Sequence, residues 1–321
     1  MAAASNLPVQ TRIVAFGDAA LAQAATLIRA GAPVAVPTET VYGLAADAAD
    51  AAAVARIYAA KGRPLFNPLI IHVADLAMAE TLGVFDAAAR ALAAAFWPGP
   101  LTLVVPLRCG APVAALATAG LDTIALRVPA HRAMQALIAA TARPLAAPSA
   151  NASGRISPTR AAHVAASLAG RIALVIDDGP CAAGLESTIV RVTAGRVEIL
   201  RPGPVTAAAL AAASGLAVVA AGTAGPVAAP GQLASHYAPH KPLRLNAASF
   251  ADDEWGIGFG ALAGDDNLSP HGDLVAAAAR LFDALHRGDA SNRAAIAVAA
   301  IPGEGLGLSI NDRLNRAAAP R

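Results

Sequence analysis

The chain has 321 residues, of which 56% are hydrophobic, 4% aromatic and 14% charged, and its formal net charge is +2. So much apolar content excludes a chain kept disordered by charge and low hydrophobicity. The balanced charge argues against a nucleic-acid-binding protein, which usually carries a strong basic excess. The length predicts two domains. Alanine occupies 90 positions, so the apolar content consists mostly of methyl groups rather than large core side chains.

Lysine and cysteine usage narrows the possibilities further. Lys61 and Lys241 are the only lysines among 24 basic residues, and a lysine retained in such a chain indicates a need for a compact ammonium group. Cys109 and Cys181 lie far apart without CxxC spacing, so they predict neither a disulfide framework nor a zinc site. The N-terminus shows no signal-peptide pattern, and glycine and proline interrupt the longest apolar stretch, 207–230. We therefore expect a cytoplasmic protein with no membrane span.

The first two-thirds of the chain alternates helical and strand patterns, which predicts an α/β domain. Helices are expected over 18–31, 51–60, 86–96, 131–141 and 157–170. Strands are expected over 33–36, 69–73, 101–107, 123–128, 172–176, 187–192 and 196–200. Ser157 and Pro158 have the N-cap and N1 pattern of a helix start.

A second, smaller unit is expected toward the C-terminus. A short helix over 206–214 leads into an Ala/Gly/Pro-rich segment, 215–235, which we interpret as an inter-domain linker. Strands over 243–245, 255–259 and 295–299 and helices over 274–287 and 306–316 then predict a small Rossmann-like α/β domain. The expected division is a catalytic domain over 1–205, a linker over 206–240 and the small domain over 241–321.

Familiar catalytic motifs are absent from the sequence. It contains no GxxxxGK[ST] phosphate loop, no HExxH helix and no GxSxG nucleophile turn. His236 and His240 have the spacing of a helical metal pair, but Pro239 interrupts the helix that would align them. The sequence therefore predicts no resident metal site.

Three segments gather unusual polar residues. Residues 37–44, PTETVYGL, place hydroxyl and carboxyl groups at a strand end, which fits a hydrogen-bonded turn and a polar pocket equally well. In 61–72, KGRPLFNPLIIH, an extended backbone would aim Lys61 and Arg63 the same way, as a polyphosphate requires. A solvated basic loop is the alternative for that pair, and His72 fits either a pocket or a core.

The third segment is residues 146–154, AAPSANASG, followed by Ser157. Its small residues allow close backbone approach, and Ser149 and Asn151 add uncharged hydrogen-bonding groups. Such a loop before a helix can hold an anion, although an ordinary Ser/Asn turn is the better interpretation of the loop taken alone. Together the three segments predict a cationic, amide-lined pocket that acts by positioning and charge neutralisation, as in a nucleotide-handling enzyme.

These segments together resemble the YrdC-like threonylcarbamoyl-AMP synthase family. The resemblance rests on PTETVYGL, on Lys61 and Arg63 with NPLIIH, and on Ser149 and Asn151 in an SxN motif. FWPGPLTLVV (96–105), DTIALRVP (122–129) and ESTIV (186–190) match in the same order. The HYAP that ends the linker and the extra α/β unit resemble the longer, two-domain form of the family.

The resemblance implies a twisted, mostly parallel sheet with flanking helices around a large concave cavity. It also implies synthesis of threonylcarbamoyl-AMP and pyrophosphate from ATP, L-threonine and bicarbonate, with Mg²⁺ accompanying ATP. A separate transferase would use the product to modify tRNA, so direct tRNA binding is expected to be weak or absent.

The resemblance also assigns residues. Those implied to hold L-threonine are Thr40, His72, Arg127, the backbone of Ala147, and Ser187, with Arg127 pairing the carboxylate. Those implied to surround ATP are Lys61, Arg63, Asn67, Thr123, Ser149, Asn151, Ser157 and Arg201, with Tyr237 closing over the nucleotide. Lys61 and Arg63 would be the catalytic pair, because they neutralise the pyrophosphate that leaves.

Two other functions stay open at this point. A carbamoyl-adenylate former that feeds a different carbamoyl transferase would normally carry zinc-finger or acylphosphatase-like modules, and two isolated cysteines cannot build the finger. A double-stranded RNA-binding module would use the concave face, but the near-neutral charge argues against tight, salt-dependent RNA binding.

Overall fold

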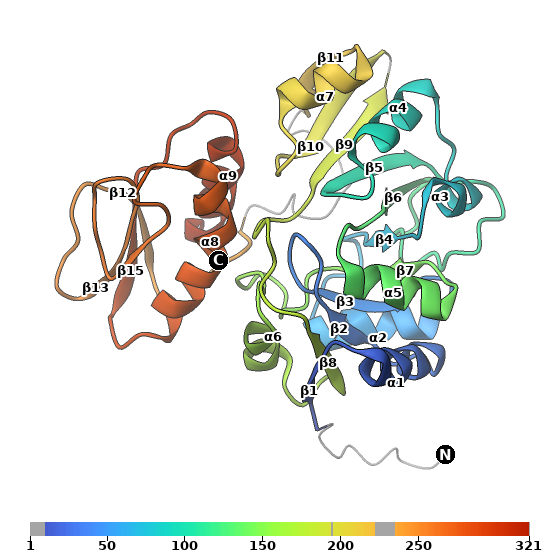
Figure 1. Cartoon of the computed structure of the whole chain (residues 1–321), viewed down its shortest axis with the longest axis horizontal. Helices are drawn as coiled ribbons and strands as arrows, with labels where there is room; N and C mark the ends of the chain where they lie inside the picture. The colour runs from blue at the N-terminus through green and yellow to red at the C-terminus, as the bar shows by residue number, and fades with distance from the viewer. Residues whose placement is uncertain (1–9, 194, 222–234, 321) are drawn as a thin grey trace.

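The computed structural model describes residues 10–193, 195–221 and 235–320. They form a larger domain and a smaller C-terminal domain, each with a sheet and flanking helices (Figure 1). This arrangement confirms the α/β fold class expected from the sequence. Within the described residues, none of the helices combines the length and the apolar character needed to cross a membrane.

The larger domain contains an 11-stranded sheet in the order β1-β8-β2-β3-β7-β4-β6-β5-β9-β10-β11. Its strands are β1 (Arg12–Ala15), β2 (Val34–Val36), β3 (Gly43–Asp47), β4 (Ile70–His72), β5 (Leu101–Pro106), β6 (Thr123–Arg127), β7 (Leu145–Ala146), β8 (Leu174–Asp177), β9 (Thr188–Thr193), β10 (Arg196–Arg201) and β11 (Ala217–Ala220). Parallel and antiparallel pairs of neighbouring strands are equally frequent among them, so the sheet is mixed.

Alanine-rich segments form the helices of this domain, since alanine has the highest helix propensity. The helices are α1 (Asp18–Arg29), α2 (Ala51–Lys61), α3 (Leu76–Leu82), α4 (Ala87–Phe96), α5 (Arg132–Thr141), α6 (Ala161–Leu168) and α7 (Ala207–Ser214). Aspartate side chains cap the starts of α2, α3 and α4, where Asp50, Asp75 and Asp86 accept backbone N–H hydrogen bonds. Gly62 ends α2 in the left-handed conformation and so turns the chain into the loop that carries Arg63.

The smaller domain has four parallel strands in the order β12-β15-β13-β14. They are β12 (Leu243–Ala247), β13 (Glu254–Gly258), β14 (Asp266–Asn267) and β15 (Ala295–Ala299), accompanied by α8 (Leu274–Ala290) and α9 (Gly307–Ala318). Figure 1 shows α8 and α9 on the side of this sheet that faces the larger domain. Phe282 of α8 belongs to one buried cluster with Val41, Ile156 and Leu185 of the larger domain. The two domains therefore share a hydrophobic core.

Two local expectations differ from the structure. Helix α6 begins at Ala161, not at residue 157, because the Ser157 hydroxyl donates to the carboxylate of Glu186 and does not cap the helix. The segment 206–240 is not a linker throughout, because β11 pairs in parallel with β10 and extends the large sheet to residue 220. The four residues of β11, AVVA, lie within an alanine- and glycine-rich stretch whose composition indicates a linker rather than a strand. Residues 222–234 of the expected linker lie outside the described residues.

One glycine allows the close packing of the two domains. Gly184 has φ +68°, and a Cβ placed on it would lie 2.5 Å from the backbone of Ala279 in α8. A side chain at this position would therefore have to push α8 away from the larger domain. Gly170 offers a control, because it has φ +78° but nothing lies within 4 Å of its would-be Cβ.

We expect Gly184→Ala to lower the free energy of unfolding by about 3 kcal/mol or more, since steric overlap adds to backbone strain. Gly170→Ala should cost only about 1 kcal/mol, the strain of a left-handed alanine. Urea denaturation of both variants checks this. Equal losses in the two variants would show that α8 does not pack tightly on Gly184.

Candidate active site

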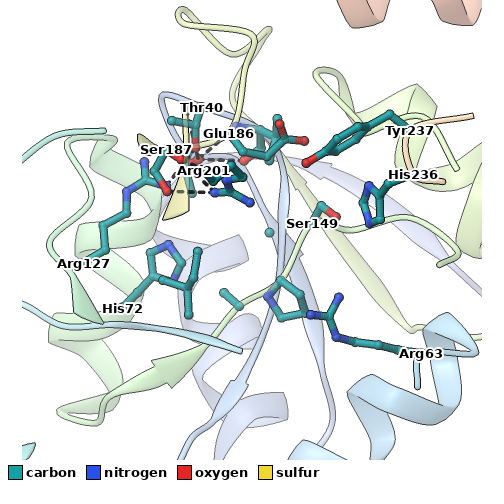
Figure 2. A pocket seen from close by; sticks show the side chains of 16 residues that line it. Thr40, Arg63, His72, Arg127, Ser149, Glu186, Ser187, Arg201, His236 and Tyr237 are labelled. Atoms are coloured by element: carbon teal, nitrogen blue, oxygen red, sulfur yellow. Dashed lines mark hydrogen bonds between the residues drawn. The ribbon is translucent and has the colours of Figure 1, made fainter. Parts of the chain in front are cut away.

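A pocket with about 560 Å³ of empty space lies in the larger domain beside the linker residues His236 and Tyr237. Figure 2 shows Arg127 and His72 on one side of the pocket and His236 and Tyr237 on the other. The residues that line it are Thr38, Thr40, Val41, Gly43, Arg63, Ile70, His72, Arg127, Ala147, Pro148, Ser149, Glu186, Ser187, Arg201, His236 and Tyr237.

Two neighbouring parallel strands place a histidine and an arginine together. His72 ends β4, Arg127 ends β6, and the two residues are register partners. Arg127 is buried and extends three ways: its Nε donates to the Gly99 carbonyl at 3.1 Å, its Nη1 to the Thr40 hydroxyl at 2.9 Å, and its Nη2 lies 2.6 Å from a carboxylate oxygen of Glu39. The guanidinium is thus fixed in orientation at the pocket wall.

Burial and the charge of Arg127 shift the pKa values of two neighbouring side chains, His72 and Glu39. Burial, and then the charge of Arg127, lowers the pKa of His72 to about 3, so its imidazole is neutral at pH 7. Within the described structure, the buried Nδ1 of His72 has no hydrogen-bond partner. Burial raises the pKa of Glu39, but the adjacent Arg127 outweighs this effect and keeps the carboxyl ionised with a lowered pKa. This end of the pocket therefore offers a fixed cation beside a neutral imidazole.

The loop after α2 supplies a second buried cation. Arg63 donates from Nε to the Asn67 carbonyl at 3.2 Å and from Nη2 to the Pro68 carbonyl at 2.9 Å. The Tyr58 hydroxyl donates to the same Asn67 carbonyl at 2.9 Å, which fixes the turn. Burial lowers the pKa of Arg63 to about 10, so the guanidinium stays charged at neutral pH.

Lys61 lies behind the pocket wall. Its Nζ donates to the carbonyls of Ser149 and Asn151 at 2.5 Å each, and the side chain is 3% exposed. Burial, and then the charge of Arg63, lowers the pKa of Lys61 well below its ordinary value. The lysine therefore connects the SxN loop to the end of α2, which fixes the position of the loop relative to Arg63.

The wall opposite Arg63 is formed by β9, β10 and the residues before β9. Arg201 donates from Nε and Nη2 to the Ser187 carbonyl, at 3.1 and 2.9 Å, and from Nη2 to the Ser187 hydroxyl at 3.1 Å. The Ser187 hydroxyl also lies 2.7 Å from that of Thr102. Glu186, the neighbour of Ser187, lines the pocket and accepts from the Ser157 hydroxyl.

Two linker residues form the wall nearest the smaller domain. Tyr237 is 1% exposed, has a left-handed backbone with φ 64°, and packs against the rings of His236 and Phe282. Such a φ is unfavourable for a residue with a side chain, so packing holds it there. Among the described residues the Tyr237 hydroxyl, which Figure 2 shows facing the pocket, has no hydrogen-bond partner.

The structure brings most of the sequence-predicted site residues to this pocket. Those that line it are Thr40, His72, Arg127, Ala147, Ser187, Arg63, Ser149, Arg201 and Tyr237. Those buried near the wall without lining it are Lys61, Asn67, Asn151 and Ser157. Thr123 begins β6, four positions before Arg127, and does not line the pocket. The Ala147 amide already donates to the Ile70 carbonyl at 3.0 Å, so its carbonyl is the backbone group left to meet a ligand.

Three residues of the site were missed by the sequence analysis. Glu186 begins the recognised ESTIV motif but was given no role, although its position next to Ser187 was a usable signal. His236 begins the HYAP that supports the resemblance, but metal ligation is the one role that the sequence suggests for it. Glu39 lies in PTETVYGL next to Thr40, and its pairing with Arg127 spans a sequence distance that no local pattern shows. In the described part of the chain, no cluster of three His, Cys, Asp or Glu residues could hold a metal ion.

Comparisons with known proteins cover almost the whole chain. A family model described as telomere recombination, for the Sua5, YciO and YrdC proteins, matches residues 26–203. A second, described as threonylcarbamoyl-AMP synthase, C-terminal domain, matches residues 205–319. The chain belongs to the threonylcarbamoyl-AMP synthase family. The presence of both matches makes it the two-domain form, as the motifs indicated.

Individual relatives agree with this assignment. Threonylcarbamoyl-AMP synthase of Bacillus subtilis is 40% identical over 328 residues, which cover 95% of this chain and 94% of that protein. The synthase of Pyrococcus abyssi is 40% identical over 320 residues, covering 93% and 94%. The crystal structure of P. abyssi Sua5 complexed with L-threonine superposes with a TM-score of 0.87 at 36% identity, covering 96% of this chain and 98% of that one. The recognised family, the fold and the nucleotidyltransferase-type enzyme class are thereby confirmed, and of the three functions considered the matches support the synthase.

The neutral state of His72 gives this site a pH signature. Its pKa is near 6.5 in an unfolded chain and about 3 in the folded one. Between these values the unfolded chain binds more protons, so stability falls as pH drops from about 6.5.

Between pH 7 and pH 5, the free energy of unfolding should fall by about 2 kcal/mol more in the wild type than in His72→Gln, because glutamine does not titrate. Urea denaturation of both proteins at the two pH values, at one ionic strength, measures the difference. If wild type and variant lost the same stability, His72 would be protonated in the folded protein and its assignment as a neutral imidazole would be wrong.

Proposed function

We propose that this pocket makes threonylcarbamoyl-AMP and pyrophosphate from ATP, L-threonine and bicarbonate. The observation that carries the proposal is that one pocket holds the fixed guanidinium of Arg127 together with Arg63, Ser149 and Arg201. An amino acid carboxylate and a polyphosphate can therefore bind side by side. The bound L-threonine in the P. abyssi relative supports the first half of this assignment.

L-threonine would bind at the end near β4 and β6. Arg127 pairs with its carboxylate, sharing its guanidinium with Glu39, and the hydroxyls of Thr40 and Ser187 offer hydrogen bonds to the polar substrate atoms. His72 is neutral, so its free Nδ1 can exchange hydrogen bonds with the substrate amine or hydroxyl without adding charge. The Ala147 carbonyl is a further acceptor.

ATP would bind between Arg63, Ser149 and Arg201, with Tyr237 closing the pocket. Backbone carbonyls, and not carboxylates, accept these hydrogen bonds from Arg63 and Arg201, so both guanidinium groups are held in place without a directly bonded counter-ion. Asn67, Asn151 and Ser157 support this wall from behind. Thr123, at the start of β6, does not line the pocket and is given no part in ATP binding. Lys61 holds the SxN loop and adds its charge to that of Arg63.

The chemistry needs no protein nucleophile. The threonine amine attacks the carbon of carbon dioxide, supplied by bicarbonate, and loses a proton, which forms a carbamate. A carbamate oxygen then attacks the α-phosphorus of ATP, the bond to the bridging oxygen breaks, and pyrophosphate leaves with the electron pair. Arg127 and His72 orient the carbamate, and Lys61 and Arg63 neutralise the leaving pyrophosphate.

Mg²⁺ would enter with ATP rather than reside in the protein. Glu186 is the one carboxylate among the described pocket-lining residues, and Ser157 and Arg313 engage its oxygens. A pocket of hydroxyls and guanidinium groups fits a metal that keeps its waters and phosphate ligands. When bound, the ion would add charge neutralisation at the phosphates.

The product would pass to a separate tRNA threonylcarbamoyl transferase. This division of labour requires no tight contact between this chain and tRNA, in keeping with its near-neutral charge. Because the substrates and the receiving tRNA are cytoplasmic, we place the enzyme in the cytoplasm.

Release of pyrophosphate from ATP tests the function directly. We expect release that requires both L-threonine and bicarbonate, with threonylcarbamoyl-AMP identified by mass spectrometry. A chain that released pyrophosphate without threonine, or bound RNA tightly with no turnover, would belong to one of the other two functions.

Replacing Lys61 should abolish activity without unfolding the protein. We expect Lys61→Ala to lower kcat/KM for pyrophosphate release by about 100-fold or more, since both loop position and charge are lost. Lys241→Ala is a matched control, because Lys241 also bridges two backbone carbonyls, those of Gly288 and Ser291, but in the smaller domain. Near-normal activity of Lys61→Ala would remove Lys61 from the mechanism.

Replacing Arg127 should weaken the binding of L-threonine more than the binding of ATP. We expect Arg127→Met to weaken L-threonine binding by at least about 30-fold, because a charge-assisted pair with the carboxylate is lost. Arg143→Met, which removes a half-exposed arginine that pairs with the buried Asp47 away from the pocket lining, should leave binding unchanged. Isothermal titration of L-threonine measures both, and equal affinities in the two variants would contradict the assigned carboxylate site.

A further inference from the structure

A buried arginine from the smaller domain reaches the pocket wall. Arg313 of α9 is completely buried, and its Nε donates to Oε2 of Glu186 at 2.9 Å. Its Nη1 donates to the Pro202 carbonyl and to Oδ2 of the neighbouring Asp312, at 2.8 Å each. Its guanidinium carbon lies 5.4 Å from the centre of the Tyr237 ring. Arg313 therefore touches the pocket-lining carboxylate, a linker residue that closes the pocket, and the turn after β10.

The residues around Glu186 are held in place from both domains. On one side Gly184 packs against the backbone of α8, and on the other a Cβ on Gly203 would lie 2.4 Å from the Thr188 amide. The Ser309 hydroxyl of α9 donates to the Gly203 carbonyl at 3.0 Å. The carboxylate of Glu186 can therefore rotate little, and both its oxygens are engaged, by Ser157 and by Arg313.

The charge of Glu186 is unfavourable for the proposed substrate. A polyphosphate in the pocket would meet this carboxylate at short range in a poorly solvated site, where like charges repel strongly. Arg313 supplies the opposite charge from outside the pocket, so the wall as a whole does not repel the nucleotide. Burial raises the pKa of Glu186, but Arg313 and Arg201 outweigh it and hold the carboxyl in its ionised form.

We infer that Arg313 is a positioning residue for the ATP half of the pocket. It neutralises the charge of Glu186 and holds the side chains of Glu186 and Tyr237 in place. Through Arg313, the smaller domain is part of the nucleotide site. This inference rests on the proposed function. A purely structural role is the alternative, since a buried ion pair need not stabilise a fold on balance. The two roles differ in what they do to the KM for ATP and in how that KM depends on pH.

The first experiment compares Arg313→Met with Arg280→Met in full-length protein. Arg280 also forms an ion pair in the smaller domain, with Asp266, but lies on the outside of α8 and does not line the pocket. We expect Arg313→Met to raise the KM for ATP by about tenfold or more and the KM for L-threonine by less than about threefold. Arg280→Met should change neither. Thermal denaturation checks that both variants are folded.

The second experiment identifies the charge of Glu186 as the cause. Arg313 is the strongest of the charges that lower the pKa of Glu186, so its removal should raise this pKa. The ATP defect of Arg313→Met should then grow as pH increases and the carboxyl ionises. Adding Glu186→Gln to Arg313→Met should lower the KM for ATP at least about fivefold. The charged or titratable groups that face Glu186 are Arg313, Arg201, His236 and Tyr237.

The outcomes separate the inference from the proposed function. If the wild-type chain shows no threonine- and bicarbonate-dependent pyrophosphate release, the proposed function fails. If the wild type is active and Arg313→Met keeps its KM for ATP, the inference fails alone. It also fails if the KM rises without pH dependence and without recovery in the double variant, since that pattern marks a structural role. If Arg313→Met does not fold, Arg313→Gln replaces it, because its amide can still bond the Pro202 carbonyl.

Discussion

The structure depends on holding buried cations with neutral oxygens. Arg63 bonds the carbonyls of Asn67 and Pro68, Arg201 bonds that of Ser187, and Lys61 bonds two carbonyls of the SxN loop. Carbonyl oxygens fix the direction of a cation without cancelling its charge. A pocket built in this way stays positive, at the cost of desolvating several charged groups. Anionic substrates would offset part of this desolvation free energy when they bind. Substrate binding would therefore stabilise the pocket wall.

The backbone that supplies these carbonyls is itself tightly fixed. The SxN loop bonds to the strand β3, where the Leu44 amide donates to the Pro148 carbonyl at 2.7 Å. The turn after β10 is packed against Ser187 at a glycine and is held by α9. The smaller domain therefore acts on the pocket through backbone segments, because its helices support the turns whose carbonyls and side chains face the ligand. A separate domain with its own parallel sheet thus contributes to a site formed by the larger one.

Much of this could be predicted from the sequence. The apolar runs before His72 and Arg127 gave both strands, and the motifs gave the residues at their ends, because local patterns carry such information. Strand β3, GLAAD, was missed because glycine, alanine and aspartate give no strand signal, although all five residues are buried. Ser157 was misplaced as a helix cap because its real partner, Glu186, is 29 residues away. Arg313 could not have been found at all, since its partner lies 127 residues away in another domain.

The scarcity of lysine has a consequence for an enzyme that makes an acyl adenylate. Such mixed anhydrides acylate amines, whereas a guanidinium is protonated and unreactive at neutral pH. With arginine at 22 of 24 basic positions, the side chains offer this reagent two primary amines. Each of these amines donates to two backbone carbonyls, and the one nearest the pocket is almost completely buried. The reactive product therefore meets few lysine amines in the protein that it could modify.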